Sequence, residues 1–119
     1  MARFTVHQQH LSDAAEKKLN SVGWDGDFGD FEAAIVCHRD VKFRGSAEYK
    51  PFYFNLYQPV GVIEAEDLDD VYFIGNCRHQ DITRLSERMH SVSVGDIIEN
   101  EDGEFFMVEG EGFNQVEVA

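Results

Sequence analysis

Long apolar runs are missing from this sequence, and cysteine and proline are each present only twice. No run approaches the roughly 20 residues that span a bilayer, and the N-terminus lacks the apolar segment of a signal peptide. We therefore expect a cytoplasmic protein with no membrane partner. In a reducing compartment the default for Cys37 and Cys77 is two buried or half-buried thiols, and a disulfide between them is the alternative.

Sequence signatures of enzymes are also missing. The chain has no nucleophile elbow, no phosphate-binding loop and no dinucleotide fingerprint. Asp25 begins a stretch that superficially resembles a calcium loop, but the fifth and twelfth positions of that pattern fall on Gly29 and Val36, which are not ligands. We expect a surface loop here, with Trp24 or Phe28 tucked into the core.

Two further groups of reactive side chains are considered and set aside. Residues 37–38 and 77–79 together supply two cysteines and two histidines, but zinc ligands normally have two to four residues between them. Glu64 and Glu66 lie two positions apart on one strand face, where solvated side chains are the better interpretation than an acid and base pair. We therefore predict a protein without catalytic residues, bound metal or cofactor, which is not an enzyme.

The net charge of −13 is distributed unevenly along the chain. Residues 1–50 carry seven Lys and Arg against eight Asp and Glu, whereas residues 51–119 carry three against fifteen. From residue 91 onward there are eight carboxylates and no Lys or Arg. Such a surface repels phosphates, so direct nucleic-acid binding is not expected. The predicted partner-binding face consists of Asp96, Glu99, Glu101, Asp102, Glu104, Glu109 and Glu111.

This acidic face has two interpretations. In the first, the carboxylates only keep the protein in solution. In the second, they attract a basic surface on another protein, and they imitate a phosphate track in the nucleic-acid groove of that protein.

A hairpin is predicted near the end of the chain. Asp102 and Gly103 separate two apolar runs, and a pair of this kind suits the primed turns that join twisted antiparallel strands. Gly110 and Gly112 mark the next bend. Residues 91–118 are therefore expected to form a three-stranded meander.

The rest of the chain carries signals for further strands and helices. Ser12 is placed to cap a helix that Gly23 ends, and Gly75 is placed to end a later one. Pro59 predicts a bulge or kink in the longest strand. We expect strands near residues 3–8, 53–64, 93–99, 105–109 and 113–118, with helices near 13–21, 31–39 and 67–75; for 31–39 a strand is the alternative.

These elements fit one domain of residues 1–119. The predicted fold is α+β, a mainly antiparallel sheet of about five strands with two or three short helices on one face. Alternation along the strands predicts one dry face and one wet face. The expected core residues are Phe4, Val6, Phe54, Leu56, Val62, Leu68, Val71, Val94, Ile97, Phe106 and Val108.

Residues 77–90 form a basic island, which contains every Lys and Arg after residue 50. The simpler interpretation is that its arginines pair with nearby carboxylates. In the alternative, the island binds an anion such as phosphate or carboxylate, because the guanidinium fork suits both. The residues of this candidate anion site are Arg78, Arg84, Arg88, Ser91 and Ser93.

Four segments together resemble a known family. Residues 90–98 read His-Ser-Val-Ser-Val-Gly-Asp-Ile-Ile, an aromatic strand follows at 105–108, and Gly112-Phe113 closes the pattern. Upstream, residues 68–76 read Leu-Asp-Asp-Val-Tyr-Phe-Ile-Gly-Asn. Over about residues 53–117 the chain resembles the YodL-like domain of phage, plasmid and other mobile-element proteins, and in particular the short early proteins of tailed phages.

The resemblance implies a mobile-element protein acting in the cytoplasm of a host cell. Together with the acidic face, it predicts a non-enzymatic accessory protein that binds and modulates a host protein. The alternative is a small barrel of the ASCH or PUA type, in which the basic island binds RNA or a small anionic ligand. An exposed meander edge also makes a homodimer conceivable.

Overall fold

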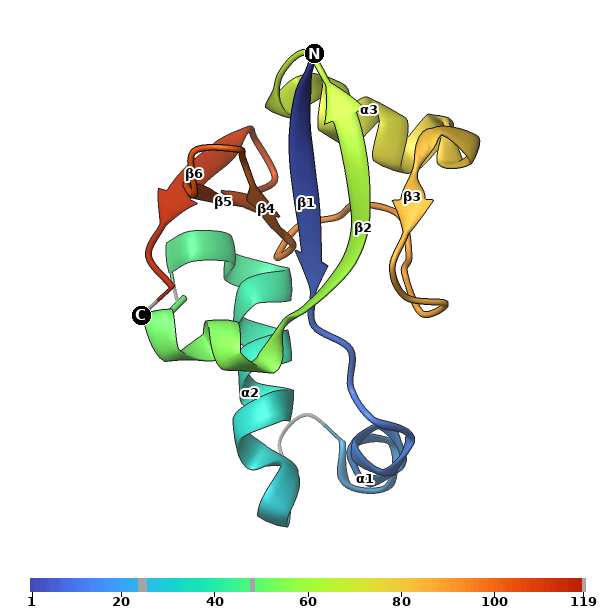
Figure 1. The fold of residues 1–119 in the computed structure, drawn as a ribbon. Helices are drawn as coiled ribbons and strands as arrows, with labels where there is room; N and C mark the ends of the chain where they lie inside the picture. The colour runs from blue at the N-terminus through green and yellow to red at the C-terminus, as the bar shows by residue number, and fades with distance from the viewer. Residues whose placement is uncertain (24–25, 48, 119) are drawn as a thin grey trace.

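A six-stranded antiparallel sheet runs through the molecule (Figure 1). The computed structural model describes residues 1–23, 26–47 and 49–118, with the backbone alone for 42–45. The strands are β1 (Ala2–Gln8), β2 (Gln58–Ala65), β3 (Thr83–Arg84), β4 (Ile97–Glu99), β5 (Phe105–Val108) and β6 (Phe113–Val116). Their order across the sheet is β3-β2-β1-β4-β5-β6, so the first strand of the chain lies inside the sheet.

The helices are capped largely as the sequence predicts. They are α1 (Asp13–Val22), α2 (Glu32–Arg44) and α3 (Leu68–Cys77), with the 3-10 helices η1 (Gly29–Phe31), η2 (Gly45–Ala47), η3 (Pro51–Leu56) and η4 (His79–Asp81). The Ser12 side chain accepts a hydrogen bond from the Ala15 amide, and Gly23 follows the helix at a φ of 74°. The carboxylate of Asp67 caps α3 in the same way.

The predicted α+β class and the C-terminal meander are confirmed, because β4, β5 and β6 pair in sequence order. The bulge expected near Pro59 is also present: His7 pairs with Pro59 and Val6 with Gly61, which leaves Val60 as the extra residue. The sequence analysis missed β3, a two-residue strand that pairs with β2 at Gly61 and Val62.

Four element boundaries were predicted wrongly. The strand expected near 93–99 begins only at Ile97. Residues 51–56 form η3 instead of the start of a strand, because Pro51 suits the first position of a helix. Helix α2 runs on to Arg44, well beyond the predicted 31–39. Gly75 does not end α3, which continues to Cys77, and Gly75 is instead buried against Val92.

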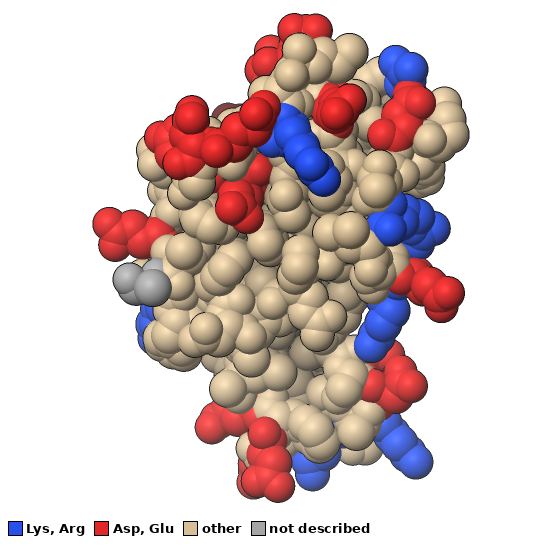
Figure 2. All heavy atoms as spheres, viewed as in Figure 1, with Lys and Arg blue, Asp and Glu red and all other residues tan. Residues whose placement is uncertain are grey.

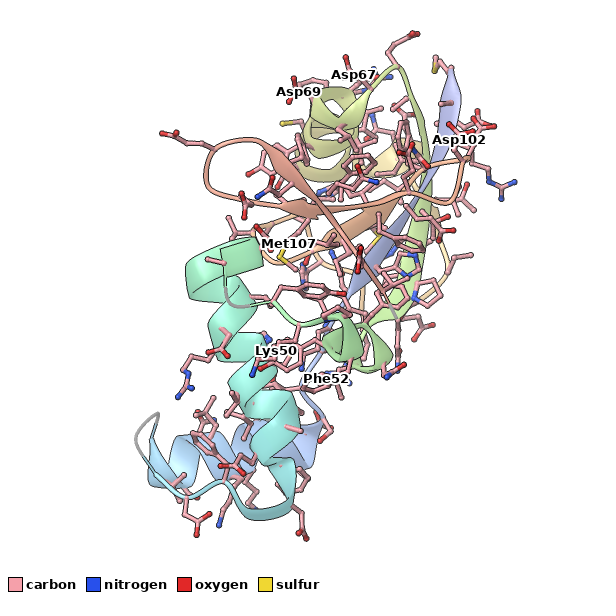
Figure 3. The ribbon with its side chains drawn as sticks, turned by 90° about the vertical axis from the view of Figure 1, so that its left-hand side faces the viewer. Lys50, Phe52, Asp67, Asp69, Asp102 and Met107 are labelled. Carbon is pink, nitrogen blue, oxygen red and sulfur yellow. The ribbon has the colours of Figure 1, made fainter. Side chains whose placement is uncertain are left out.

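Helices cover both faces of the sheet, not one as predicted. Ile97 and Ile98 are adjacent in β4, so they point to opposite faces, and both are fully buried. Ile98 belongs to a cluster that includes α3, whereas Ile97 packs with residues of α2 and η3. Figure 3 shows Met107 on the second of these faces, between the sheet and the helices. The sheet therefore has two dry faces.

The predicted core is correct for the strands and incomplete for the helices. Six of the expected residues are buried, namely Phe4, Val6, Val62, Val71, Ile97 and Val108. The others are half-buried, namely Phe54, Leu56, Leu68, Val94 and Phe106. A separate cluster between α1 and α2 was missed apart from the expected burial of Phe28, and it consists of Leu11, Ala15, Phe28 and Ile35.

The sheet is open, with β3 at one edge and β6 at the other. Among the strands that the structure describes, no pairing closes the sheet, so the strand order gives no support to the alternative of a small barrel of the ASCH or PUA type. Within the same residues, no helix is both long and apolar enough to cross a membrane.

Candidate functional site

Two acidic segments that are far apart in the sequence meet at one end of the molecule. The Arg3 amide donates a hydrogen bond of 2.7 Å to the Glu101 carboxylate, in the turn between β4 and β5. On the other side of β1, Arg3 is paired in register with Glu64 at the end of β2. The β4–β5 turn and the β2–α3 connection therefore flank the start of β1.

We call the carboxylates of these two segments the acidic end. Its residues are Glu64, Glu66, Asp67, Asp69, Asp70, Glu101, Asp102 and Glu104. Figure 2 shows carboxylates gathered over the end of the molecule that holds the N-terminus, above a broad area with few charges. Figure 3 shows Asp67 and Asp69 at the start of α3 and Asp102 in the β4–β5 turn at this same end.

The acidic end only partly matches the predicted face. Glu101, Asp102 and Glu104 were predicted and are exposed here. The five carboxylates of the β2–α3 segment were missed, because they come near Glu101 and its turn only when β1 pairs with β2. The one local signal was the negative charge at the start of α3, which the helix macrodipole explains equally well.

Asp96 was predicted on the acidic face, and this is wrong. Its side chain is 4% exposed. The carboxylate accepts hydrogen bonds from the Gln8 side chain at 3.0 Å and from the Ser93 amide at 2.9 Å. Asp96 therefore connects β1 to the loop before β4 and is not available to a partner.

Glu99 and Glu109 from the predicted face are half-buried and already bonded. Glu99 accepts from the His7 ring, with 3.0 Å between Oε1 and Nε2. Glu109 accepts hydrogen bonds from the Ser46 hydroxyl and amide, and these bonds lower the pKa of its carboxyl. Glu111 is exposed, but it lies in the β5–β6 turn, outside the acidic end.

A hollow of about 330 Å³ opens beside the acidic end. Its lining residues are Met1, Glu64, Asp70, Ile74, Arg78 and Asp81. Three of these are carboxylates, and Arg78 is held in a salt bridge of 2.6 Å with Asp81. Asp70 is half-buried, and its carboxylate already accepts a hydrogen bond of 3.0 Å from the Glu66 amide, whereas Glu64 is exposed at the hollow.

The arginines of the basic island point to different places, so the predicted five-residue anion site is wrong as a unit. Arg78 pairs with Asp81. Arg84 donates from Nη2 to the carbonyls of Glu87 and Met89 at 3.1 Å each. Arg88 donates to the carbonyl of Leu11 at 3.0 Å.

Two of the five predicted residues nevertheless line one small cavity. Arg84 and Ser91 face a space of about 80 Å³ that His79 and His90 also line. The Ser93 amide instead donates to Asp96, outside this cavity. Sequence reasoning missed both histidines, although they stand within the basic island.

The two pairs of residues in the considered zinc site, at 37–38 and at 77–79, lie apart from each other. Cys37 is buried among residues of α2 and η3, whereas Cys77 is exposed at the end of α3, across the sheet. Burial raises the pKa of the Cys37 thiol to about 12. No cluster of three or more His, Cys, Asp or Glu suited to a metal occurs within the described ranges.

The remaining predictions about loops and carboxylates have mixed outcomes. Phe28 is buried, as expected for the loop, whereas Trp24 and Asp25 lie outside the described residues. Glu64 and Glu66 are both exposed, and only Glu64 lines the hollow.

In comparisons with protein-family models, with curated proteins and with solved structures, nothing matches this chain significantly.

Proposed function

We propose that this chain is a non-enzymatic accessory protein of a phage or other mobile element, which binds a basic surface of a host protein through its acidic end. The observation that carries the proposal is the hydrogen bond between the Arg3 amide and Glu101. This bond and the pairing of Arg3 with Glu64 place two acidic segments side by side. The YodL-like resemblance supports the mobile-element setting and a location in the host cytoplasm.

The charge balance at the acidic end favours a basic partner. Eight carboxylates lie there, and Arg3 is the neighbouring cation within the sheet. Exposed charges of one sign steer a partner of opposite charge and raise the rate of association, an effect that salt screens. A lysine or arginine of the partner can enter the hollow beside Glu64.

Two triple variants with equal charge change test this proposal. The first, Glu66→Gln with Asp69→Asn and Asp102→Asn, neutralises exposed carboxylates of the acidic end. The control, Glu16→Gln with Asp30→Asn and Glu32→Gln, neutralises exposed carboxylates near α1 and the start of α2, at the opposite end of the molecule (Figure 1). Both change the net charge from −13 to −10.

The readout is recovery of partners from a bacterial host lysate by the immobilised protein, followed by affinity measurement with the purified partner. We expect one or a few saturable partners, with affinity that falls as salt rises. The acidic-end variant should bind at least about tenfold more weakly, while the control variant binds as the parent does. Equal weakening by both variants would contradict the proposal, because net charge alone would then explain binding.

The imitation of nucleic acid is a narrower form of the same proposal. It predicts that the partner binds DNA or RNA and that this nucleic acid competes with the acidic end for one site. A partner that binds both at once would exclude the narrower form and leave the docking of the acidic end intact.

The homodimer stays a prediction, supported by the position of β6 at an edge of the sheet. Its strand residues Phe113 to Val116 carry no charge and no proline, the usual protections of an edge. Sedimentation of the purified protein over a range of concentrations tests it, and a constant monomer mass would exclude it.

A further inference from the structure

We propose that the cavity between α3, β3 and the segment before β4 binds a small tetrahedral oxyanion, namely phosphate as the free ion or as the head group of a small phosphomonoester. The site is independent of the acidic end and takes a ligand of the opposite charge. Four polar side chains line the cavity: His79, Arg84, His90 and Ser91. Ile82 and Met89 supply apolar lining.

The size of the cavity selects a small ligand. Its volume of about 80 Å³ lies far below the roughly 300–1,000 Å³ of pockets that enclose drug-sized molecules. A nucleoside does not fit this space. An oxyanion of a single phosphorus or sulfur centre matches it, and a small substituent on one oxygen can extend into solvent.

Arg84 is held in position by its own chain and keeps free donors. Its Nη2 atom donates to the carbonyls of Glu87 and Met89, and these two bonds fix the plane of the guanidinium. An arginine has five N–H donors, so those on Nε and Nη1 remain. Within the described ranges, no carboxylate forms a salt bridge with Arg84, in contrast to Arg78. A fixed guanidinium with unused donors is the arrangement that binds phosphate in a bidentate manner.

Ser91 and His79 supply donors from two other segments. The Ser91 hydroxyl lies 3.3 Å from Nε2 of His79, although the residues are twelve positions apart. Both side chains are exposed at the cavity, so an entering oxyanion can accept from the hydroxyl and from the ring. No carboxylate is among the residues that line this cavity, whereas carboxylates dominate the surface of the acidic end.

His90 is held at the cavity by a hydrogen bond of its ring. Its Nδ1 lies 2.7 Å from the Ser91 carbonyl, which can only accept, so Nδ1 carries the proton. This bond fixes the orientation of the imidazole that lines the cavity beside Arg84 and Ser91.

The test is an NMR titration with sodium phosphate at constant ionic strength, maintained with sodium chloride. We expect saturable shifts of the His79 and His90 ring signals and of the Ser91 amide. Phosphoserine, as the amino acid, distinguishes the two sources of the ligand. Equal affinity indicates recognition of the head group, and preference for phosphate indicates the free ion.

Arg84→Gln and Arg88→Gln form a matched pair. Each removes one positive charge and at least one hydrogen bond to a backbone carbonyl. Arg84→Gln should weaken phosphate binding by at least about tenfold, and Arg88→Gln by less than about twofold. Equal weakening by the two variants would overturn the proposal, as would phosphate that shifts none of the three signals beyond the chloride control.

A second variant keeps the test valid if Arg84→Gln does not fold. His79→Gln with Ser91→Ala changes two exposed side chains that form a hydrogen bond with each other, so the fold should persist by circular dichroism. The double variant should weaken phosphate binding several-fold. Unchanged affinity in a folded double variant would also overturn the site.

Discussion

Gln8 donates a hydrogen bond to Asp96 inside the protein, with 3.0 Å between Nε2 and Oδ2, although 88 positions separate them in the chain. Gln8 also donates to the His90 carbonyl and accepts from the His90 amide. One fully buried amide side chain therefore holds the whole loop before β4 against β1. The loop that positions His90 and Ser91 depends on this contact.

We expect Asp96→Ala to lower the free energy of unfolding by about 3 kcal/mol, because the Gln8 side chain and the Ser93 amide would lose a buried acceptor. Urea denaturation followed by circular dichroism measures the effect. Asp102→Ala is the matched control, since that carboxylate is exposed, and it should change stability by less than about 0.5 kcal/mol. Similar losses in the two variants would contradict the structural role of Asp96.

Gly75→Ala should destabilise the protein by about 1–2 kcal/mol, although alanine favours a helix by nearly 1 kcal/mol over glycine. A Cβ at this position would lie 2.3 Å from Cγ2 of Val92, which is fully buried and cannot move aside. Thermal unfolding measures the change. Gly110→Ala, which meets no atom within 4 Å, should leave the melting temperature almost unchanged. A more stable Gly75→Ala protein would mean that α3 and Val92 pack less closely than described.

Iodoacetamide should modify only one of the two thiols in the native protein. Cys77 is exposed, whereas Cys37 is fully buried and its pKa is raised to about 12, so it has almost no thiolate at pH 8. Mass spectrometry should find one added group under native conditions and two in urea. Cys77→Ser should abolish the native reaction, and persistent labelling of that variant would show that Cys37 is accessible.

Glu109 should make the protein sensitive to acid. Hydrogen bonds from Ser46 lower the pKa of this carboxyl in the folded state from its ordinary value of 4.5. A lowered folded pKa gives stability that is present above pH 4.5 and is lost as the pH falls through the folded pKa. Urea unfolding at pH 6 and at pH 3 should therefore differ less for Glu109→Gln than for the parent. Glu111→Gln, an exposed neighbour, should behave as the parent, and the same result for both variants would argue against this role.

The predictable parts of the fold are those with local signals. Ser12 caps its helix by bonding three residues along the chain, and the Asp102-Gly103 pair marks the turn of the hairpin. The expected primed turn is wrong, because Gly103 has a φ of 79° but Asp102 does not have a positive φ. The two dry faces were not predictable. Ile97 and Ile98 are adjacent apolar residues, but the sequence around them does not show that helices pack on both faces of the sheet. Alternation predicts a wet face only when one face stays uncovered.

The candidate site was predictable in part for the same reason. Counting charges identified Glu101, Asp102 and Glu104, which are exposed, but it treated Asp96 as one more surface carboxylate. Only the contact with Gln8 distinguishes Asp96, and nothing near it in the sequence indicates that contact. The β2–α3 half of the acidic end likewise depends on the register that pairs Arg3 with Glu64.

The inner position of β1 determines when the sheet can assemble during synthesis. Of the described strands β1 is translated first, whereas β4, one of its two neighbours, is translated near the end of the described chain. Until then the backbone donors and acceptors on that side of β1 have no strand to pair with. A nascent chain must therefore keep that side of β1 open to water or to a chaperone, and a chain that stops before Ile97 can form only the β3-β2-β1 half of the sheet, with β1 as an exposed edge.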